Sequence, residues 1–392
     1  MKTIDNYHFL NRIPIVRVDF NVPQNSILRV LDNTRIIETI ATIYKIIISD
    51  VVLLISHLGS PYGEISNKFS LKNILPFLQK ELKMQVHFSK EFIGNKIHRK
   101  LYFFKKEILL LDNIRFFKEE DGNEAFAKQL AQLGDIYVND AFGVSHRLHT
   151  TITKLTKFFP NLKSFGVLMS NEFQALNHIV KYGKKPITAI IGGAKVSSKI
   201  DIIVNILPLI DHLLIAGGMA YTFIKVIEGK VGNSIVDYYK KTFVFEIFKK
   251  SFMNKVHVYL PIDVIIANAL NKDANFKEKF AKKITKGWMG LDIGKKSIHE
   301  FSKVIYRSLS IFWNGPLGVF EIPIFSNGTL SIIKTIENVN LKGTFSMVGG
   351  GDSILSIKKY KDKVSYISTG GGAMLEILKG KILPGVEAIV NN

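Results

Sequence analysis

The sequence predicts an α/β protein in which short buried strands alternate with helices around parallel sheets. Apolar runs of four or five residues, such as residues 51–55, recur along the chain and are separated by longer mixed stretches. The 392 residues suit two domains, each large enough for its own core. Together these features are typical of repeated βα units distributed over two lobes.

The composition indicates a globular protein of the cytoplasm. It is 47% hydrophobic and 22% charged, and it contains no cysteine, which excludes disulfides and thiolate metal sites. The start of the chain lacks the uninterrupted apolar core of a secretory signal. Residues 202–224 are the most apolar stretch, but Pro208, Asp211 and a Gly-Gly pair interrupt them, so we expect no membrane span.

The formal net charge of +20 has two interpretations. Fifty-three Lys+Arg against 33 Asp+Glu could mark a protein that binds nucleic acid or an anionic membrane. The alternative is coding bias, since residues with AT-rich codons abound and only eight of the basic residues are arginine. The lysines are spread without a basic arm or an aromatic-interleaved run, so we favour coding bias. The rare arginines then become informative.

The expected strands of the first half all end in polar or charged side chains. In parallel sheets, ligands gather beyond the carboxyl ends of the strands. Strands at residues 15–18, 51–55, 108–111 and 136–138 are followed by Asp19 and Asn21, by His57, by Asp112 and Arg115, and by Asn139 and Asp140, with His146 and Arg147 in the next loop. These groups fit a small anionic substrate.

The expected strands of the second half end in glycine. The runs at residues 188–191, 213–216, 311–313, 345–348 and 366–369 lead into Gly192-Gly193-Ala194-Lys195, Gly217-Gly218, Asn314-Gly315-Pro316, Gly349-Gly350-Gly351-Asp352 and Gly370-Gly371-Gly372. Glycine lets backbone N–H groups approach an anion closely, and a helix N-terminus favours negative charge. One Gly-Gly pair is weak evidence, but five such ends in one half predict a polyphosphate site.

Several familiar nucleotide enzymes are excluded. The chain has no G-x-x-x-x-G-K-[ST] loop, no G-x-G-x-x-G after the first strand, and no HRD, DFG and APE set. What remains is phosphoryl transfer between a nucleotide held by one lobe and an acidic acceptor held by the other.

At this point the chain resembles a known family, phosphoglycerate kinase. The resemblance rests on blocks that occur in the family's order across nearly the whole chain: RVDFNVP (17–23), SHLG (56–59), YVNDAFG (137–143), GGAKV (192–196), MGLDIG (289–294), WNGPLGVFE (313–321), GGGDS (349–353), STGGGA (368–373) and LPGVEA (383–388).

The resemblance implies two Rossmann-like three-layer αβα lobes, each around a six-stranded parallel sheet and joined by a helix and hinge. The phosphoglycerate-binding lobe would comprise residues 1–168, with the C-terminal segment 378–392 packing back on it. Residues 169–182 would form the interlobe helix, and residues 183–377 the nucleotide-binding lobe.

The implied reaction is 1,3-bisphosphoglycerate + ADP = 3-phosphoglycerate + ATP in glycolysis, with Mg²⁺ as the partner of the nucleotide. The implied partners are these small molecules, with neither nucleic acid nor membrane, and the implied state is a monomer in the cytoplasm. No general base is needed, because the acceptor carboxylate is already ionised at neutral pH.

The resemblance also assigns roles in the first half. Asp19 and Asn21 match residues that bind the hydroxyl and carboxylate of the glycerate, and Arg35 matches an arginine that grips the carboxylate and the transferring group. The substrate phosphate would be held by Arg115 and Arg147, with His57 and Gly59 beside them. His146 and His149 are interpreted as loop histidines, since neither has metal-ligand spacing.

In the second half, Lys195 matches the lysine that stabilises the transferring phosphoryl group, assisted by the N–H groups of Gly371 and Gly372. Asp352 would coordinate Mg²⁺. The other implied nucleotide-binding residues are Lys199, Gly217, Gly218, Gly290, Asn314, Pro316, Glu321 (on the ribose), Gly350, Gly351 and Ser353.

Two positions depart from the family pattern. Ser60 stands where SHLGRP has an arginine on the substrate phosphate, and Ser198 stands where many members carry aspartate. One hypothesis couples these losses across a closing cleft; independent drift is the simpler explanation, and we favour it. Weaker binding of 3-phosphoglycerate is expected in either case.

Two rival functions were weighed. A kinase acting on another small carboxylate would keep the glycines, but it would not need Asp19 and Asn21 beside Arg115 and Arg147. A nonenzymatic binder of nucleic acid would show tight, salt-sensitive binding without turnover.

Overall fold

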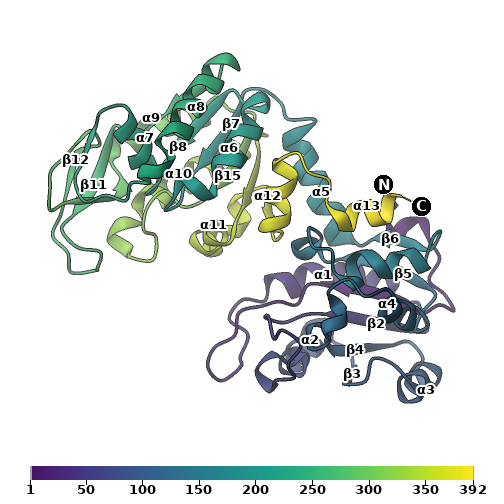
Figure 1. Cartoon of the computed structure of the whole chain (residues 1–392). Coiled ribbons are helices and arrows are strands. Elements are labelled where there is room, and N and C mark those ends of the chain that lie inside the picture. The colour runs from purple at the N-terminus through teal and green to yellow at the C-terminus, as the bar shows by residue number, and fades with distance from the viewer. Residues whose placement is uncertain (1, 392) are drawn as a thin grey trace. The chain divides into compact units, whose positions relative to one another are not determined.

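The computed structural model describes residues 2–391, apart from the side chains of Asp352 and Lys358. It divides into two compact units, Met1–Phe173 with Ile382–Asn392, and Gln174–Lys381. Each unit is built on its own six-stranded parallel sheet with helices between the strands (Figure 1). The predicted fold class is therefore confirmed.

The sheet of the first unit has the strand order β3-β4-β2-β1-β5-β6. Each predicted strand is present and extends one or two residues further at one or both ends. The strands are β1 (Pro14–Val18), β2 (Val51–Ser56), β3 (Val86–Ser89), β4 (Glu107–Asn113), β5 (Ile136–Asp140) and β6 (Lys163–Phe165). The helices are α1 (Thr34–Ile46), α2 (Leu75–Leu82), α3 (Asn95–Phe103), α4 (Glu124–Ala131), the first part of α5 (Val167–Val180) and α13 (Pro384–Val390).

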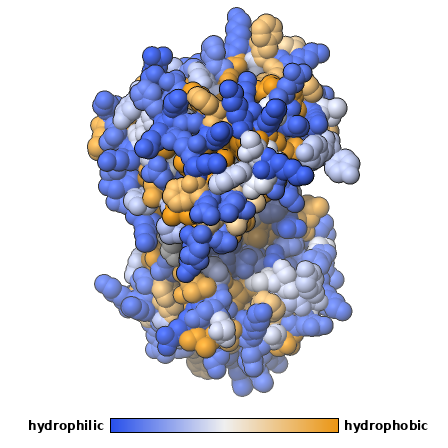
Figure 2. Space-filling view, turned by 90° about the vertical axis from the view of Figure 1, so that its left-hand side faces the viewer, coloured by the Kyte–Doolittle hydropathy of each residue, from blue (hydrophilic) through white to orange (hydrophobic). Residues whose placement is uncertain are grey.

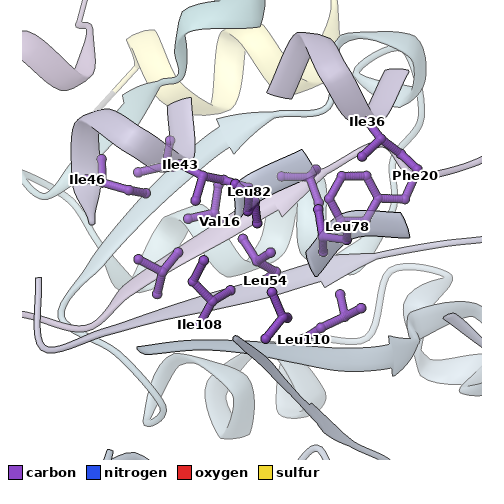
Figure 3. Packing of buried hydrophobic residues seen from close by; sticks show 14 of the residues in the cluster. Val16, Phe20, Ile36, Ile43, Ile46, Leu54, Leu78, Leu82, Ile108 and Leu110 are labelled. Carbon is purple, nitrogen blue, oxygen red and sulfur yellow. The ribbon is translucent and has the colours of Figure 1, made fainter. Parts of the chain in front are cut away.

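The core of this unit follows from the alternation of side chains along the strands. Val16 and Val18 of β1 are fully buried and belong to one apolar cluster with residues of α1 and α2, such as Ile43 and Leu78 (Figure 3). Alternate residues of a strand point to opposite faces, so Arg17 lies on the other side of the sheet. That fully buried arginine is important for the site described below.

The second unit has the strand order β10-β8-β7-β15-β16-β17. These strands are β7 (Ile187–Ile191), β8 (His212–Ile215), β10 (His257–Tyr259), β15 (Ser310–Asn314), β16 (Phe345–Gly349) and β17 (Tyr366–Ser368). The helices are the rest of α5, α6 (Ile200–Ile206), α7 (Ala220–Val226), α8 (Lys241–Met253), α9 (Lys295–Tyr306), α10 (Asn327–Asn340), α11 (Gly351–Ser356) and α12 (Gly372–Leu378).

The second unit also contains small sheets that the sequence reasoning missed. Strands β11 (Asp263–Ala267), β12 (Phe276–Phe280) and β14 (Met289–Ile293) form an antiparallel sheet, and β9 (Lys230–Val231) pairs with β13 (Lys283–Ile284). Strand β12 is exposed throughout, so it lacks the buried apolar run that marked the other strands. Strand β14 contains the first five residues of the MGLDIG block.

The surface is mixed in character. Hydrophilic side chains predominate on the face shown in Figure 2, with hydrophobic side chains scattered between them. Among residues 2–391, no helix is both long and apolar enough to cross a lipid bilayer.

Candidate active site

The predicted substrate residues of the first unit meet at the carboxyl edge of its sheet. Asp19 and Asn21 follow β1, and Arg35 lies in the first turn of α1. His57 and Gly59 follow β2, Arg115 lies in a short helical turn after β4 (η4, Ile114–Phe116), and Arg147 lies in the loop after β5. Since β4, β2, β1 and β5 are neighbours in the sheet, their ends deliver all these groups to one edge.

Asp19, Asn21 and Arg35 form one hydrogen-bonded group. The Nη1 atom of Arg35 lies 3.3 Å from Oδ2 of Asp19 and donates to the carbonyl oxygen of Asn21 at 2.9 Å. The backbone N–H of Asn21 donates to Oδ1 of Asp19 at 3.1 Å. Asp19 is 3% exposed, whereas the Arg35 side chain keeps 32% of its surface. The carboxylate thus orients the guanidinium and leaves part of it open to a ligand.

Gly59 links this group to Arg115. Its N–H donates to Oδ1 of Asn21 at 2.8 Å, and its carbonyl accepts from Nη1 of Arg115 at 2.7 Å. Its φ angle is +61°, and a Cβ atom there would lie 2.4 Å from the ring of Phe69. Only glycine fits without displacement at this position.

His57 is 1% exposed, with Nε2 lying 3.8 Å from Oδ1 of Asp19. Burial, together with the positive charges of Arg17, Arg115 and Arg35, lowers the pKa of His57 well below its usual value. The sequence reasoning placed His57 in the cluster as a basic residue. Instead it is neutral at physiological pH, so it can contribute hydrogen bonding and packing but no charge.

A cavity of about 450 Å³ opens beside these residues. Arg115 and Arg147 line it together with Ser60, and Nη1 of Arg115 lies 3.5 Å from the hydroxyl oxygen of Ser60. The remaining lining residues are Tyr62, Gly63, Phe117, Lys118, Glu120, Asp121 and His149. Two arginines and a lysine outnumber the two carboxylates on its wall, so the cavity fits a phosphate or another small anion at the arginines.

A buried network on and behind the wall of this cavity was not foreseen: sequence reasoning missed Arg17, Glu120 and Thr151, and it named His149 only as a loop histidine. Arg17, Glu120 and Thr151 are buried and in mutual contact, and Nδ1 of His149 lies 3.8 Å from Oε1 of Glu120. His149 lies in the loop that its sequence position indicates, and burial with nearby arginines lowers its pKa to about 3. One signal was available for Arg17: a charged residue between Val16 and Val18 in an apolar strand requires a buried partner.

In the second unit, the glycine turns pack against one another. The N–H of Gly193 donates to the carbonyl of Pro316 at 3.0 Å, and the N–H of Gly217 donates to the carbonyl of Leu317 at 3.1 Å. A Cβ atom on Gly217 would lie 2.7 Å from the Gly193 nitrogen. A side chain at Gly217 would therefore force these turns apart.

Two cavities flank these turns and share Gly193 and Ala194. The larger holds about 510 Å³ and is mostly apolar; the predicted residues on its wall are Gly217, Gly218, Gly290, Pro316 and Glu321. Its wall also contains Tyr221, Asn233, Ile235 and Leu270, which the sequence reasoning missed. This cavity fits a flat apolar base, and the carboxylate of Glu321 lies on its wall.

Packing requires glycine at position 290, which sequence reasoning did not foresee. A Cβ atom there would lie 1.8 Å from the hydroxyl oxygen of Tyr221. The side-chain space at residue 290 is therefore filled by Tyr221, which is itself buried.

The smaller cavity holds about 270 Å³ and is lined by both predicted lysines, Lys195 and Lys199. It is also lined by Ser198, which departs from the family pattern, and by Gly350, Gly351 and Ser353. Nζ of Lys199 donates to Oδ1 of Asn314, and the Ser353 hydroxyl accepts from the N–H of Gly315 at 2.6 Å. Lysines and glycines around a small cavity have the charge and the backbone access that suit a polyphosphate.

Four predicted residues are not among those that line the two cavities: Asn314, which contacts Lys199, and Gly371, Gly372 and Asp352. Gly371 and Gly372 follow β17, at the edge strand beside β16, and belong to neither cavity. The side chain of Asp352 lies outside the described residues, although its backbone lies in the first turn of α11, between Gly351 and Ser353 of the smaller cavity. Among the side chains that the structure describes, no group of three or more His, Asp or Glu could hold a metal ion.

Comparison with known proteins agrees with this geometry. The family model described as phosphoglycerate kinase matches residues 4–381. The phosphoglycerate kinase of Porphyromonas gingivalis is 40% identical over 416 aligned positions, covering 99% of each chain. The cytosolic phosphoglycerate kinase of Nicotiana tabacum is 42% identical, covering 95% of this chain and 94% of the relative. The solved phosphoglycerate kinase structure from Coxiella burnetii has a TM-score of 0.88 at 32% identity, covering 99% of this chain and 98% of that one.

Proposed function

The chain belongs to the phosphoglycerate kinase family, and we propose that the two units described above are its two substrate lobes. The enzyme catalyses the reversible transfer of a phosphoryl group between ATP and the carboxylate of 3-phosphoglycerate, a step of glycolysis. The observation that carries the assignment of lobes is the contrast between their sites. One unit presents arginines around a small cavity, and the other presents glycines and lysines beside an apolar one.

In the first unit we assign the substrate by charge and reach. Asp19, Asn21 and Arg35 bind the hydroxyl and carboxylate of 3-phosphoglycerate, because these side chains already form one oriented group. Arg115 and Arg147 lie on the wall of the 450 Å³ cavity, which we call the cationic cavity, and bind the phosphate of 3-phosphoglycerate. His57 contacts Asp19 and Gly59 contacts Arg115, so these two residues fix the positions of the carboxylate-binding and phosphate-binding side chains.

In the second unit we assign the nucleotide. Its base enters the larger cavity against the backbone of Gly217, Gly218 and Gly290, with Glu321 on the ribose and Pro316 beside it. The phosphates enter the smaller cavity, where Lys199, Gly350, Gly351 and Ser353 lie and where Asn314 orients Lys199. The shared wall at Gly193 and Ala194 lets one ligand occupy both cavities.

The chemistry needs positioning and charge neutralisation. The ionised carboxylate of 3-phosphoglycerate attacks the γ-phosphorus of ATP, and the bond to the β-phosphate oxygen breaks, with no proton transferred. Arg35 from one unit and Lys195 from the other stabilise the charge on the group in flight, assisted by the N–H groups of Gly371 and Gly372. These residues belong to different units, so the reaction requires the units to close about a hinge and exclude water.

Mg²⁺ is expected to enter with the nucleotide. The smaller cavity is lined by lysines, glycines and serines, so the phosphates and water would supply most ligands of the ion, with Asp352 as the protein carboxylate. When bound, the cation neutralises phosphate charge in the transition state. The fit is that of an ion shared with a substrate.

We propose a monomer in the cytoplasm that acts on these small molecules and on neither nucleic acid nor membranes. The plant relatives named cytosolic support the compartment. The positive net charge is then a property of coding bias and not of a polyanionic partner.

A coupled assay with 1,3-bisphosphoglycerate and ADP tests the proposal. We expect ATP formation that requires both substrates and is lost in Lys195→Met. Small-angle scattering should show compaction only when both substrates are present. Turnover without any compaction would contradict the hinge, and a folded chain without turnover would contradict the assignment.

A further inference from the structure

The cations of the 450 Å³ cavity come from two separate segments of the first unit. Arg115 lies on the segment that ends in the short turn Lys118–Glu120 (η5), and Arg147 precedes the turn Thr150–Lys154 (η7). Both segments line the cavity, so the bonds between them fix the positions of its two arginines relative to each other.

Thr150 joins the two segments through hydrogen bonds between its side chain and backbone groups of the opposite segment. Its hydroxyl donates to the carbonyl of Glu119 at 2.6 Å and accepts from the N–H groups of Gly122 and Asn123 at 3.0 and 2.8 Å. Thr150 is fully buried, so each of these bonds is protected from water.

Thr151 joins the same segments through a side chain, that of Glu120. Its hydroxyl donates to Oε1 of Glu120 at 2.6 Å, and its backbone N–H donates to Oε2 at 3.0 Å. Its carbonyl accepts from the hydroxyl of Tyr137, on β5, at 2.6 Å. Thr151 is fully buried and Glu120 is 2% exposed. Both oxygens of a buried carboxylate are thus used by one residue of the opposite segment.

Arg17 supplies the charge that lets Glu120 be buried. Its Nε atom donates to the Thr151 hydroxyl at 2.9 Å, and its Nη2 atom lies 3.9 Å from Oε1 of Glu120. Burial raises the pKa of Glu120, while Arg17 and the Thr151 bonds oppose that rise. Nη2 of Arg17 also lies 3.4 Å from Nδ1 of His57, so the network extends to the residues on the substrate carboxylate side.

We propose that Glu120 and Thr151 are positioning residues of the phosphoglycerate site, which fix the spacing between Arg115 and Arg147. The inference rests on the proposed function of this cavity. A carboxylate beside an anion site should weaken phosphate binding if charge alone mattered. If it acts by holding the arginines in place, its loss weakens binding instead. The two roles predict changes of opposite sign.

Thr151→Val tests the role without changing any charge, because valine keeps the shape and removes the hydroxyl. We expect KM for 3-phosphoglycerate to rise about tenfold or more and KM for ATP to stay within twofold, because the Thr151 hydroxyl makes two buried hydrogen bonds, to Glu120 and from Arg17. Thr151→Ser should restore the value of the parent chain. Thr156→Val is the matched control: Thr156 is 2% exposed, and its hydroxyl bonds only the nearby Thr153 carbonyl at 2.6 Å.

Glu120→Gln then separates positioning from charge. We expect at least a tenfold rise in Kd for 3-phosphoglycerate by calorimetry, with ADP binding unchanged. An unchanged or lower Kd in a folded Glu120→Gln chain would overturn the proposal, and so would an equal effect of Thr156→Val and Thr151→Val. If Glu120→Gln does not fold, Thr151→Val decides alone. Failure of the proposed function would show as absent turnover in the parent chain, which is distinguishable from both outcomes.

Discussion

Ser60→Arg should tighten the binding of 3-phosphoglycerate. Ser60 is exposed, lies on the wall of the cationic cavity, and has its hydroxyl 3.5 Å from Arg115. A charge-assisted hydrogen bond can contribute about 1.5–3 kcal/mol, but exposed ion pairs contribute only about 0.2–1 kcal/mol. The wall is open to water and Arg115 repels a second guanidinium, so we place the gain near the exposed limit. That corresponds to a Kd about two- to fivefold lower.

Titration calorimetry at fixed ionic strength measures this change, with Ser60→Gln as the control for side-chain length without charge. Raising the salt concentration should shrink the advantage of arginine, because exposed charges are screened. An equal gain for Ser60→Gln would show that the charge is irrelevant. An unchanged Kd for Ser60→Arg would show that Arg115 and Arg147 already satisfy the phosphate.

Three further predictions concern other parts of the chain. Lys199→Met should raise KM for ATP about tenfold or more and leave KM for 3-phosphoglycerate unchanged, since Lys199 lines only the smaller cavity of its unit; a shift in both constants would contradict separate sites. Burial raises the pKa of Asp140 to about 7, above its unfolded value, so the native state holds a proton that the unfolded chain releases. The free energy of unfolding should therefore fall as the pH rises from about 4 to about 7, by up to a few kcal/mol from this group. In denaturant unfolding, Asp140→Asn should show a weaker dependence of this free energy on pH. The same dependence in Asp140→Asn and the parent chain would refute this. Finally, the effects of Ser60→Arg and Ser198→Asp on kcat/KM should add within about 0.5 kcal/mol, because independent drift explains both serines; a larger interaction energy would instead favour coupling.

The sequence carried the fold and most of the site because both depend on strand ends. Buried runs such as residues 51–55 marked the parallel strands, and the polar or glycine residues after them marked the edges where ligands gather. Arg35, Arg115 and Arg147 stood out further because arginine is rare in this chain. These signals are local, so they survive without knowledge of tertiary contacts.

What the sequence could not predict depends on contacts between distant segments. Glu120 and Thr151 are 31 residues apart and look like ordinary surface residues until the chain folds. His57 looked cationic because the sequence does not reveal its burial among three arginines. Gly290 lines the larger cavity as predicted, but the sequence does not reveal that the hydroxyl of Tyr221 occupies its side-chain space.

The central claim is that each substrate has its own site, with 3-phosphoglycerate in the cationic cavity of the first unit. Titration calorimetry of Arg147→Gln tests it most directly, because Arg147 is exposed on the wall of that cavity. The account predicts a Kd for 3-phosphoglycerate raised about tenfold or more, with the Kd for ADP unchanged. Unaltered binding of 3-phosphoglycerate, or a comparable loss of ADP binding, would contradict it.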